Sequence, residues 1–152
     1  MIIKNIFDPA VVAEVVARIN QLTPTTRPQW GKMTADQVFA HLNVSYIMTY
    51  ENTIPKPNWL TRLVLKSIVK QKVVGPIPYG RSVPTAPAFK MVGTKDFNAE
   101  KTKLISYLER VARDGEQKFN CRESHSFGPL TAPEWNTMFY KHLEHHLTQF
   151  GV

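Results

Sequence analysis

The residues best suited to chemistry in this sequence are three histidines at positions 142, 145 and 146. In a helix, residues four apart lie about 40° apart in projection, so His142 and His146 would share one face. His145 would point about 100° away from His146, toward the surface. Because the shared face is otherwise mostly apolar, two unpartnered imidazoles would be costly to bury there. A divalent metal ion that takes one nitrogen from each ring would remove that cost.

His41 is the leading candidate for a third ligand, because it falls within an otherwise apolar stretch. If its helix runs antiparallel to the last one, His41 and the His142/His146 pair both lie about 10 Å from a shared end. The spacing suits histidines with structural or exposed roles equally well, and this alternative stays open. His125 lies in a predicted loop, where we expect it to hydrogen-bond to backbone.

Three neutral imidazoles would leave a divalent ion with its full positive charge and an open coordination position. Such an ion lowers the pKa of a bound water or thiol, which yields hydroxide or thiolate near neutral pH. We expect zinc or nickel first, and iron and manganese also accept imidazole. The zinc protease motif is absent, because Leu143 stands where that motif requires Glu. Asn43, Tyr46 and Glu144 are the polar candidates for supporting the metal ligands.

Four long helices are predicted to position these side chains. The first begins at Asp8-Pro9, an N-cap followed by proline in the first turn. The second runs to about residue 50 and the last to residue 150, and they begin with capping boxes at Thr34–Gln37 and Thr131–Glu134. The third is predicted over residues 97–113, ahead of Gly115. No strand pattern stands out, so the sequence predicts an all-α fold, most simply a four-helix bundle.

A long connection lies between the second and third of these helices. It contains a predicted short basic helix at about residues 59–71 and then a Pro- and Gly-rich extended stretch from residue 75 to 93. Arg62, Lys66 and Lys70 recur four residues apart, a pattern that usually marks a solvated face.

Composition favours one globular domain spanning residues 1–152. Hydrophobic residues make up 43% of the chain and charged residues 20%, which argues against disorder. The single cysteine, Cys121, excludes an internal disulfide and indicates a reducing cytoplasm. No apolar run reaches the roughly 18 residues that a membrane span needs, so we expect no membrane partner. The net charge of +7 allows binding to nucleic acid or another anion, although no RNA-binding or zinc-finger motif is present.

Three segments, Thr34–Leu42, His125–Trp135 and Lys141–Phe150, together resemble the DinB/YfiT-like superfamily, and more narrowly its DUF1569 branch of uncharacterised proteins. The resemblance covers most of the chain. It implies a four-helix bundle with one long crossover, and the stretch from about residue 51 to 96 is long enough to serve as that crossover.

The resemblance also implies a metal held by three histidines, which match His41, His142 and His146. Related members are thiol-dependent transferases or isomerases, so a low-molecular-weight thiol is implied as a second cofactor. Our first hypothesis is therefore a metal-dependent enzyme acting on a small molecule, either a thiol S-transferase or a hydrolase. The alternatives are a non-catalytic basic binding module and a catalytically idle metalloprotein or homodimeric scaffold.

Overall fold

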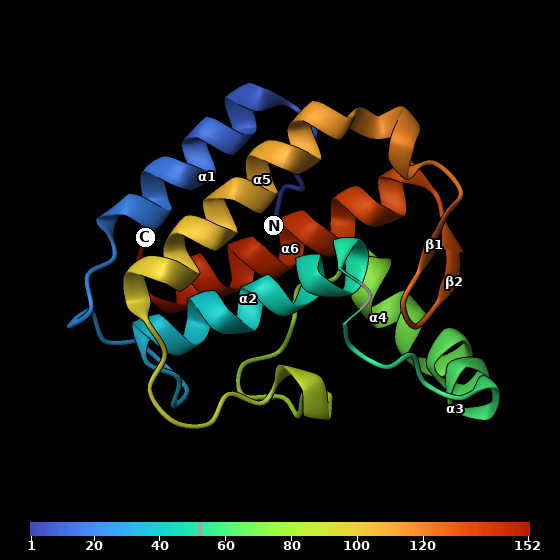
Figure 1. The fold of residues 1–152 in the computed structure, drawn as a ribbon, viewed down its shortest axis with the longest axis horizontal. Helices are drawn as coiled ribbons and strands as arrows, with labels where there is room; N and C mark the ends of the chain where they lie inside the picture. The colour runs from blue at the N-terminus through green and yellow to red at the C-terminus, as the bar shows by residue number, and fades with distance from the viewer. Residues whose placement is uncertain (52) are drawn as a thin grey trace.

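The computed structural model describes residues 1–51 and 53–152, which form a mostly helical fold with one small two-stranded sheet (Figure 1). Its long helices are α1 (Pro9–Gln21), α2 (Ala35–Tyr50), α5 (Phe97–Phe119) and α6 (Ala132–Gln149). Between α2 and α5 lie α3 (Trp59–Val64), the π-helical turn η1 (Leu65–Val69), α4 (Lys70–Val74) and a 3-10 turn, η2 (Pro87–Phe89). Within the described ranges, no helix combines the length and apolar character that crossing a bilayer requires.

The helix starts that the sequence predicts are confirmed, and each rests on local hydrogen bonds. The Asp8 carboxylate accepts a backbone N–H of the first turn of α1 at 2.8 Å. At the start of α2, the Gln37 side chain accepts the N–H of Thr34 at 3.3 Å. At the start of α6, the Glu134 carboxylate accepts the N–H of Thr131 at 2.9 Å, which completes a capping box. These bonds depend on neighbours in sequence alone, so sequence predicts them well.

The predicted all-α fold is confirmed as far as the structure is mostly helical, but it also contains a small two-stranded sheet. Strands β1 (Arg122–Ser124) and β2 (Gly128–Leu130) form an antiparallel pair in which Arg122 lies opposite Leu130. The Ser124 hydroxyl accepts the N–H of Phe127 across the turn at 2.9 Å. Strands of three residues are too short to show an alternating pattern, which is why the sequence gives no signal for them.

The break that the sequence predicts at Gly115 is confirmed, but a further helical segment follows it. Gly115 has a φ of +70° and a ψ of 168°, which is not helical, so α5 consists of two helical segments joined by a kink at this residue. The second segment ends at Phe119 and was not predicted. It is held by the fully buried Phe119, whose ring centroid lies 5.1 Å from that of Phe7 and 5.4 Å from that of Trp135.

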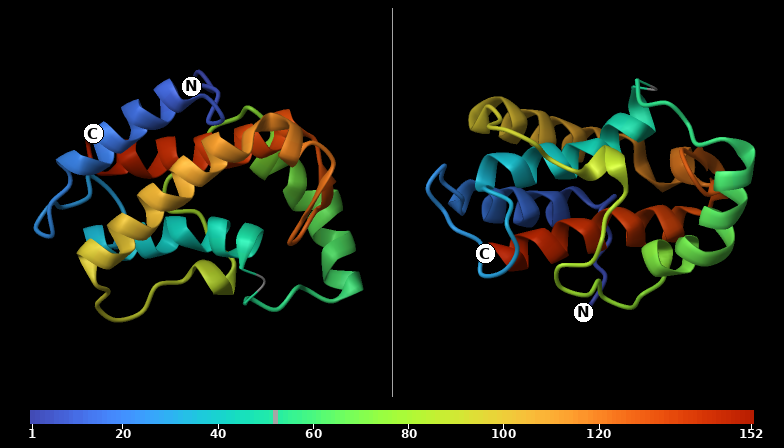
Figure 2. Two further views of the ribbon diagram at one scale, coloured as in Figure 1. Left: turned by 45° about the horizontal axis from the view of Figure 1, so that its top comes forward. Right: turned by 90° about the horizontal axis from the view of Figure 1, so that it is seen from below.

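The four long helices lie side by side, and α5 packs against α2, α1 and α6 (Figures 1 and 2). Helices α2 and α6 run in opposite directions, as the alignment of the histidines requires (Figure 1). The core between them is built from apolar residues at helical spacing: Val12, Val15 and Ile19 of α1, Val38, Phe39 and Leu42 of α2, Leu104, Leu108 and Val111 of α5, and Trp135, Phe139 and Leu143 of α6.

The connection from α2 to α5 crosses the face that α2 and α6 form (Figure 2, right). Its short helical part extends to Val74, three residues past the predicted end at 71, and its extended part contains the turn η2. It is fixed to α6 by Lys141, whose fully buried ammonium donates to the carbonyls of Gly75 and Ile77, the latter at 3.2 Å. The connection therefore covers one side of the α2/α6 pair.

Candidate metal centre

The structure brings together three imidazoles from two helices that lie far apart in sequence. His41 comes from α2, and His142 and His146 come from successive turns of α6. One ring nitrogen from each residue lies within 4.8 Å of the corresponding nitrogens of the other two. His41 and His146 are buried and His142 is half-buried. This geometry allows one metal ion to contact all three rings.

A backbone carbonyl fixes the tautomer of His41. Its Nδ1 lies 2.8 Å from the carbonyl oxygen of Phe89 in the connection that covers the site. A carbonyl oxygen can only accept, so Nδ1 carries the proton and donates. In the neutral ring, Nε2 then has a free lone pair, and it lies 2.9 Å from Nε2 of His142.

An ordered amide fixes the tautomer of His146 in the same way. The amide nitrogen of Gln149 donates to the carbonyl of Trp30 at 2.7 Å, so the amide oxygen of Gln149 must face the other way. That oxygen lies 2.7 Å from Nδ1 of His146, which therefore carries the proton. The Nε2 lone pair of His146 is free as well. Two rings are thus held in the tautomer that a metal ligand needs.

His142 has a partner that suits either tautomer. Its Nδ1 lies 3.1 Å from the hydroxyl of Ser45, and a hydroxyl can both donate and accept. When Ser45 donates, the Nε2–H of His142 can donate to His41. When Ser45 accepts, Nε2 of His142 offers its lone pair beside the other two. The local network therefore permits both a hydrogen-bonded pair of histidines and three converging lone pairs.

Burial keeps this cluster uncharged. Burial lowers the pKa of His41 and lowers the pKa of His146 to about 3, in both cases by penalising the charged ring. Burial, with the neighbouring His41 and His146 adding to it, holds the pKa of His142 well below its ordinary value. Among the described residues, the group of candidate ligands contains no carboxylate or thiolate. The three rings would act as neutral nitrogen donors.

Two aromatic rings of the connection cover the cluster. The Phe89 ring lies 5.3 Å from that of His41 and 5.8 Å from that of His142, centroid to centroid and close to edge-on. The Tyr79 ring lies 6.4 Å from that of His142. These contacts restrict access of water to the cluster from that side.

The other polar residues proposed from sequence contact residues outside the cluster, and the buried hydroxyl of Tyr46 has no hydrogen-bond partner among the described residues. Asn43 is buried and donates to the backbone carbonyl of Glu100 at 2.9 Å. Tyr46 stacks in the core on Phe139, with ring centroids 4.9 Å apart. Glu144 pairs with Arg18 at 2.6 Å. The three therefore contribute to packing and pairing between helices.

The remaining two histidines lie outside the group of three. His125 contacts backbone carbonyls at Ile54 and Pro55, both at 3.2 Å, which confirms the expected bond to backbone. His145 is half-buried, and its ring lies 5.7 Å from that of Tyr79 and 6.0 Å from that of Trp30.

Sequence reasoning missed the residues that orient the ligands. Ser45 lies four residues after His41, and Gln149 lies three residues after His146, so helical spacing could have placed both near the cluster. The carbonyl of Phe89 had no such signal, because a backbone group in an irregular stretch is recognised only once the chain is folded.

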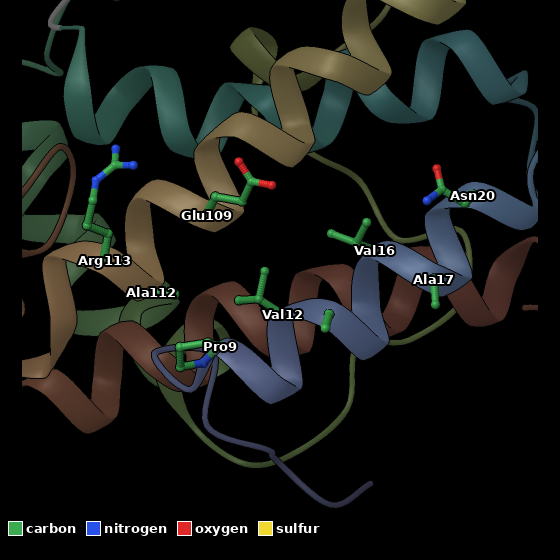
Figure 3. A pocket seen from close by; sticks show the side chains of 9 residues that line it. Pro9, Val12, Val16, Ala17, Asn20, Glu109, Ala112 and Arg113 are labelled. Atoms are coloured by element: carbon green, nitrogen blue, oxygen red, sulfur yellow. The ribbon is translucent and has the colours of Figure 1, made fainter.

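The surface has two grooves large enough to hold a small molecule. One, of about 570 Å³, lies between α1 and α5 and is lined largely by small apolar side chains, with Glu109 and Arg113 at its edge (Figure 3). None of its lining residues is a histidine. The other, of about 450 Å³, is lined partly by Tyr79, Arg81 and His145, and none of the three clustered histidines lines it. It lies near the cluster through His145, whose ring centroid is 4.9 Å from that of His146.

Comparisons with known proteins identify a family but no activity. A family model described as "Protein of unknown function (DUF1569)" matches residues 8–151. No curated protein matches the chain, and no solved structure matches it.

Proposed function

The chain belongs to the DUF1569 family, and on that premise we propose that it is a metal-dependent enzyme of the DinB/YfiT-like kind, a four-helix bundle with a long crossover. Its metal ligands are His41, His142 and His146. The observation that carries the proposal is the set of oxygen partners on the Nδ1 atoms, which leaves the Nε2 atoms to face one another. A cluster that served packing alone would not need an oxygen partner on the Nδ1 atom of each ring.

The donor set fits a divalent transition metal. Three neutral imidazole nitrogens suit zinc or nickel, and iron and manganese accept them as well. The Nε2 atoms of His41 and His142 lie 2.9 Å apart, so one ion is within reach of both. Ser45 can adapt its hydroxyl to the tautomer that ligation by His142 requires.

A bound ion would supply the positive charge that lowers the pKa of a water or of a thiol near neutral pH. The chain supplies the rest. Neutral ligands leave that charge undiminished, and Phe89 and Tyr79 limit competing water. In the adjoining groove, the Arg81 guanidinium lies 4.2 Å from the centre of the Trp30 ring and can pair with an anionic group of a small-molecule substrate. We favour S-transfer with a low-molecular-weight thiol, with small-molecule hydrolysis as the second reaction class.

Metal content is the direct test. We expect the purified protein to hold about one divalent ion per chain and His142→Ala to hold almost none, because two rings remain where three are needed. His125→Ala is the matched control, since His125 lies in the β1–β2 turn, contacts the backbone carbonyls of Ile54 and Pro55, and lies outside the cluster. Equal metal content in the wild type and His142→Ala would refute the site.

A second assay separates an enzyme from an idle metalloprotein. The metal-loaded protein is incubated with a panel of electrophiles and a low-molecular-weight thiol, and thiol consumption is followed. An enzyme consumes thiol, and His142→Ala abolishes the activity. If the protein binds metal but turns over no thiol and no hydrolysable substrate, the metal site stands and the catalytic proposal is refuted.

A further inference from the structure

The long connection between α2 and α5 carries the basic character of this protein. Residues 52–95 contain no Asp or Glu, whereas eight of the nineteen Lys and Arg residues lie there. The rest of the chain holds eleven basic and twelve acidic side chains and is close to neutral. The basic residues of the connection are Lys56, Arg62, Lys66, Lys70, Lys72, Arg81, Lys90 and Lys95.

The same stretch carries most of the exposed large apolar side chains. Of the ten that the described residues leave exposed, eight lie between residues 59 and 92. Five of these eight are concentrated in α3 and η1, and the most exposed of the five is Trp59, at 77%. These five are Trp59, Leu60, Leu63, Val64 and Ile68. An apolar group of this kind on an otherwise ordinary surface marks an interaction site.

These five residues form one face of a projecting arm, which we define as residues 59–74. Helix α3 lies at the edge of the molecule, away from the long helices (Figures 1 and 2), and no residue of α3 or η1 is buried. Trp59 and Leu63 lie one turn apart, and Leu60 and Val64 form the adjacent row. The exposed apolar side chains therefore follow one another along the first part of the arm, from Trp59 to Ile68, whereas Val73 and Val74 at its end pack against the core.

A basic row runs beside this face. Arg62, Lys66 and Lys70 follow one another at four-residue spacing. Arg62 pairs with Glu123 of β1, and Lys70 pairs with Glu134 of α6 at 2.8 Å. Within the described ranges, Lys66 has no such pair and is exposed. The arm is thus fixed to the fold by its inner side while its apolar face and Lys66 stay available.

We propose that the arm docks on the surface of a membrane that contains anionic lipids. This would revise the expectation of no membrane partner, which rested on the lack of a spanning segment alone; docking on a surface needs no such segment. The apolar face would enter the boundary between headgroups and acyl chains, as interfacial amphipathic helices do. Lys66, with its long apolar stem, would reach the lipid phosphates, and the net positive charge of the connection would attract it to an anionic surface. Trp59 at the start of the arm suits the interface, where an indole has both apolar and polar surroundings. The inference does not rest on the metal centre.

Charge favours this occupant over a second copy of the chain. Two arms facing each other would bring two basic surfaces together, and the remainder of the chain is too near neutral to compensate. Nucleic acid would match the charge but gives no role to five exposed apolar side chains, since its affinity comes from phosphate contacts. A surface of anionic lipids accounts for both the positive charge and the exposed apolar side chains of the arm.

Vesicle binding tests the proposal with the full-length protein. We expect cosedimentation with vesicles of mixed phosphatidylglycerol and phosphatidylcholine, and little with phosphatidylcholine alone. Leu63→Ser combined with Ile68→Ser should weaken binding about tenfold or more, because it removes apolar insertion. Lys66→Glu should weaken it by a similar factor, since each basic group near an anionic surface contributes about fivefold. Neither substitution touches a buried residue, so folding should be preserved.

Two exposed positions outside the connection serve as matched controls. Ile2→Ser removes an apolar side chain that is 84% exposed, and Lys32→Glu reverses an exposed charge. Both should bind vesicles like the wild type. As a further readout, Trp59→Phe should abolish a blue shift of tryptophan fluorescence that the vesicles induce.

Four outcomes would overturn the proposal. Equal binding to neutral and anionic vesicles would remove the role of charge. Loss of binding in Lys66→Glu but not in the double serine variant would mean that the basic surface binds lipid without insertion of the apolar side chains. A double serine variant that is monomeric where the wild type is dimeric in sedimentation velocity would make the face a contact between copies. Absence of binding to anionic vesicles, with capture of an oligonucleotide that depends on Lys66, would assign the surface to nucleic acid.

Discussion

Gln149 is predicted to control metal affinity without being a ligand. Its amide oxygen accepts from Nδ1 of His146, and its amide nitrogen donates to Trp30, both at 2.7 Å. Only 4% of Gln149 is exposed, so water has little room to replace a lost partner. In Gln149→Leu, His146 is no longer held in the tautomer and orientation that leave Nε2 free. Loss of such an orienting partner costs about 10–100-fold in metal affinity, or about 1.4–2.7 kcal/mol.

Gln149→Glu separates orientation of the ligand from packing. A carboxylate still accepts from His146, but it cannot donate to the carbonyl of Trp30. We therefore expect Gln149→Glu to retain most of the metal affinity, while both variants lose stability. An unsatisfied buried partner costs about 1–3 kcal/mol, which should appear in the free energy of unfolding.

Competition with a chromophoric chelator measures zinc affinity in the wild type and the two variants. Circular dichroism and urea unfolding show whether each variant is folded. Nitrogen-15 NMR of the metal-free wild type should show His146 protonated at Nδ1. Affinity within twofold of wild type in a folded Gln149→Leu, or equal loss in both variants, would refute the idea that the amide oxygen orients the ligand.

Two further predictions concern the elements that support the site. Gly31 has a φ of +82°, and a Cβ there would lie 2.5 Å from the amide nitrogen of Gln149. Gly31→Ala should therefore cost about 1–2 kcal/mol of stability and also weaken zinc binding. Gly93 is the control: its φ is +68° and the space around it is open, so Gly93→Ala should lower stability without changing zinc binding. A zinc titration of both variants decides this, and equal affinities would contradict it. Burial by itself would raise the pKa of Glu134, but the Lys70 ammonium at 2.8 Å helps to hold that pKa below its ordinary value of 4.5. Stability from this pair is complete above that value and is lost as the pH falls through the lowered pKa of the folded state. Glu134→Gln should therefore cost about 0.5–1 kcal/mol at neutral pH and progressively less as the pH falls below 4.5. Urea unfolding at neutral and acidic pH checks this, and a difference that persisted in acid would assign the cost to the capping box instead.

The parts of the fold that depend on neighbours in sequence were the most predictable. Thr34 and Thr131 begin their helices as expected, because a cap and its partner are three residues apart. The break at Gly115 was predicted, but the helical segment after it was missed, because Phe119 is held by rings from distant segments and not by a local signal. The strand at Arg122–Ser124 was missed because so short a strand is stabilised by its pairing and not by its composition.

The sequence by itself determined which residues could form the centre. Two histidines four apart on one helix, and a third in an apolar stretch, follow from residue type and helical spacing alone. Only the tertiary structure decided how these rings are oriented. The carbonyl of Phe89 and the amide of Gln149, itself set by Trp30, fix which nitrogen carries the proton. Helical periodicity places side chains on a face, but a tautomer depends on a partner within hydrogen-bond distance, and that partner comes from wherever the folded chain brings it.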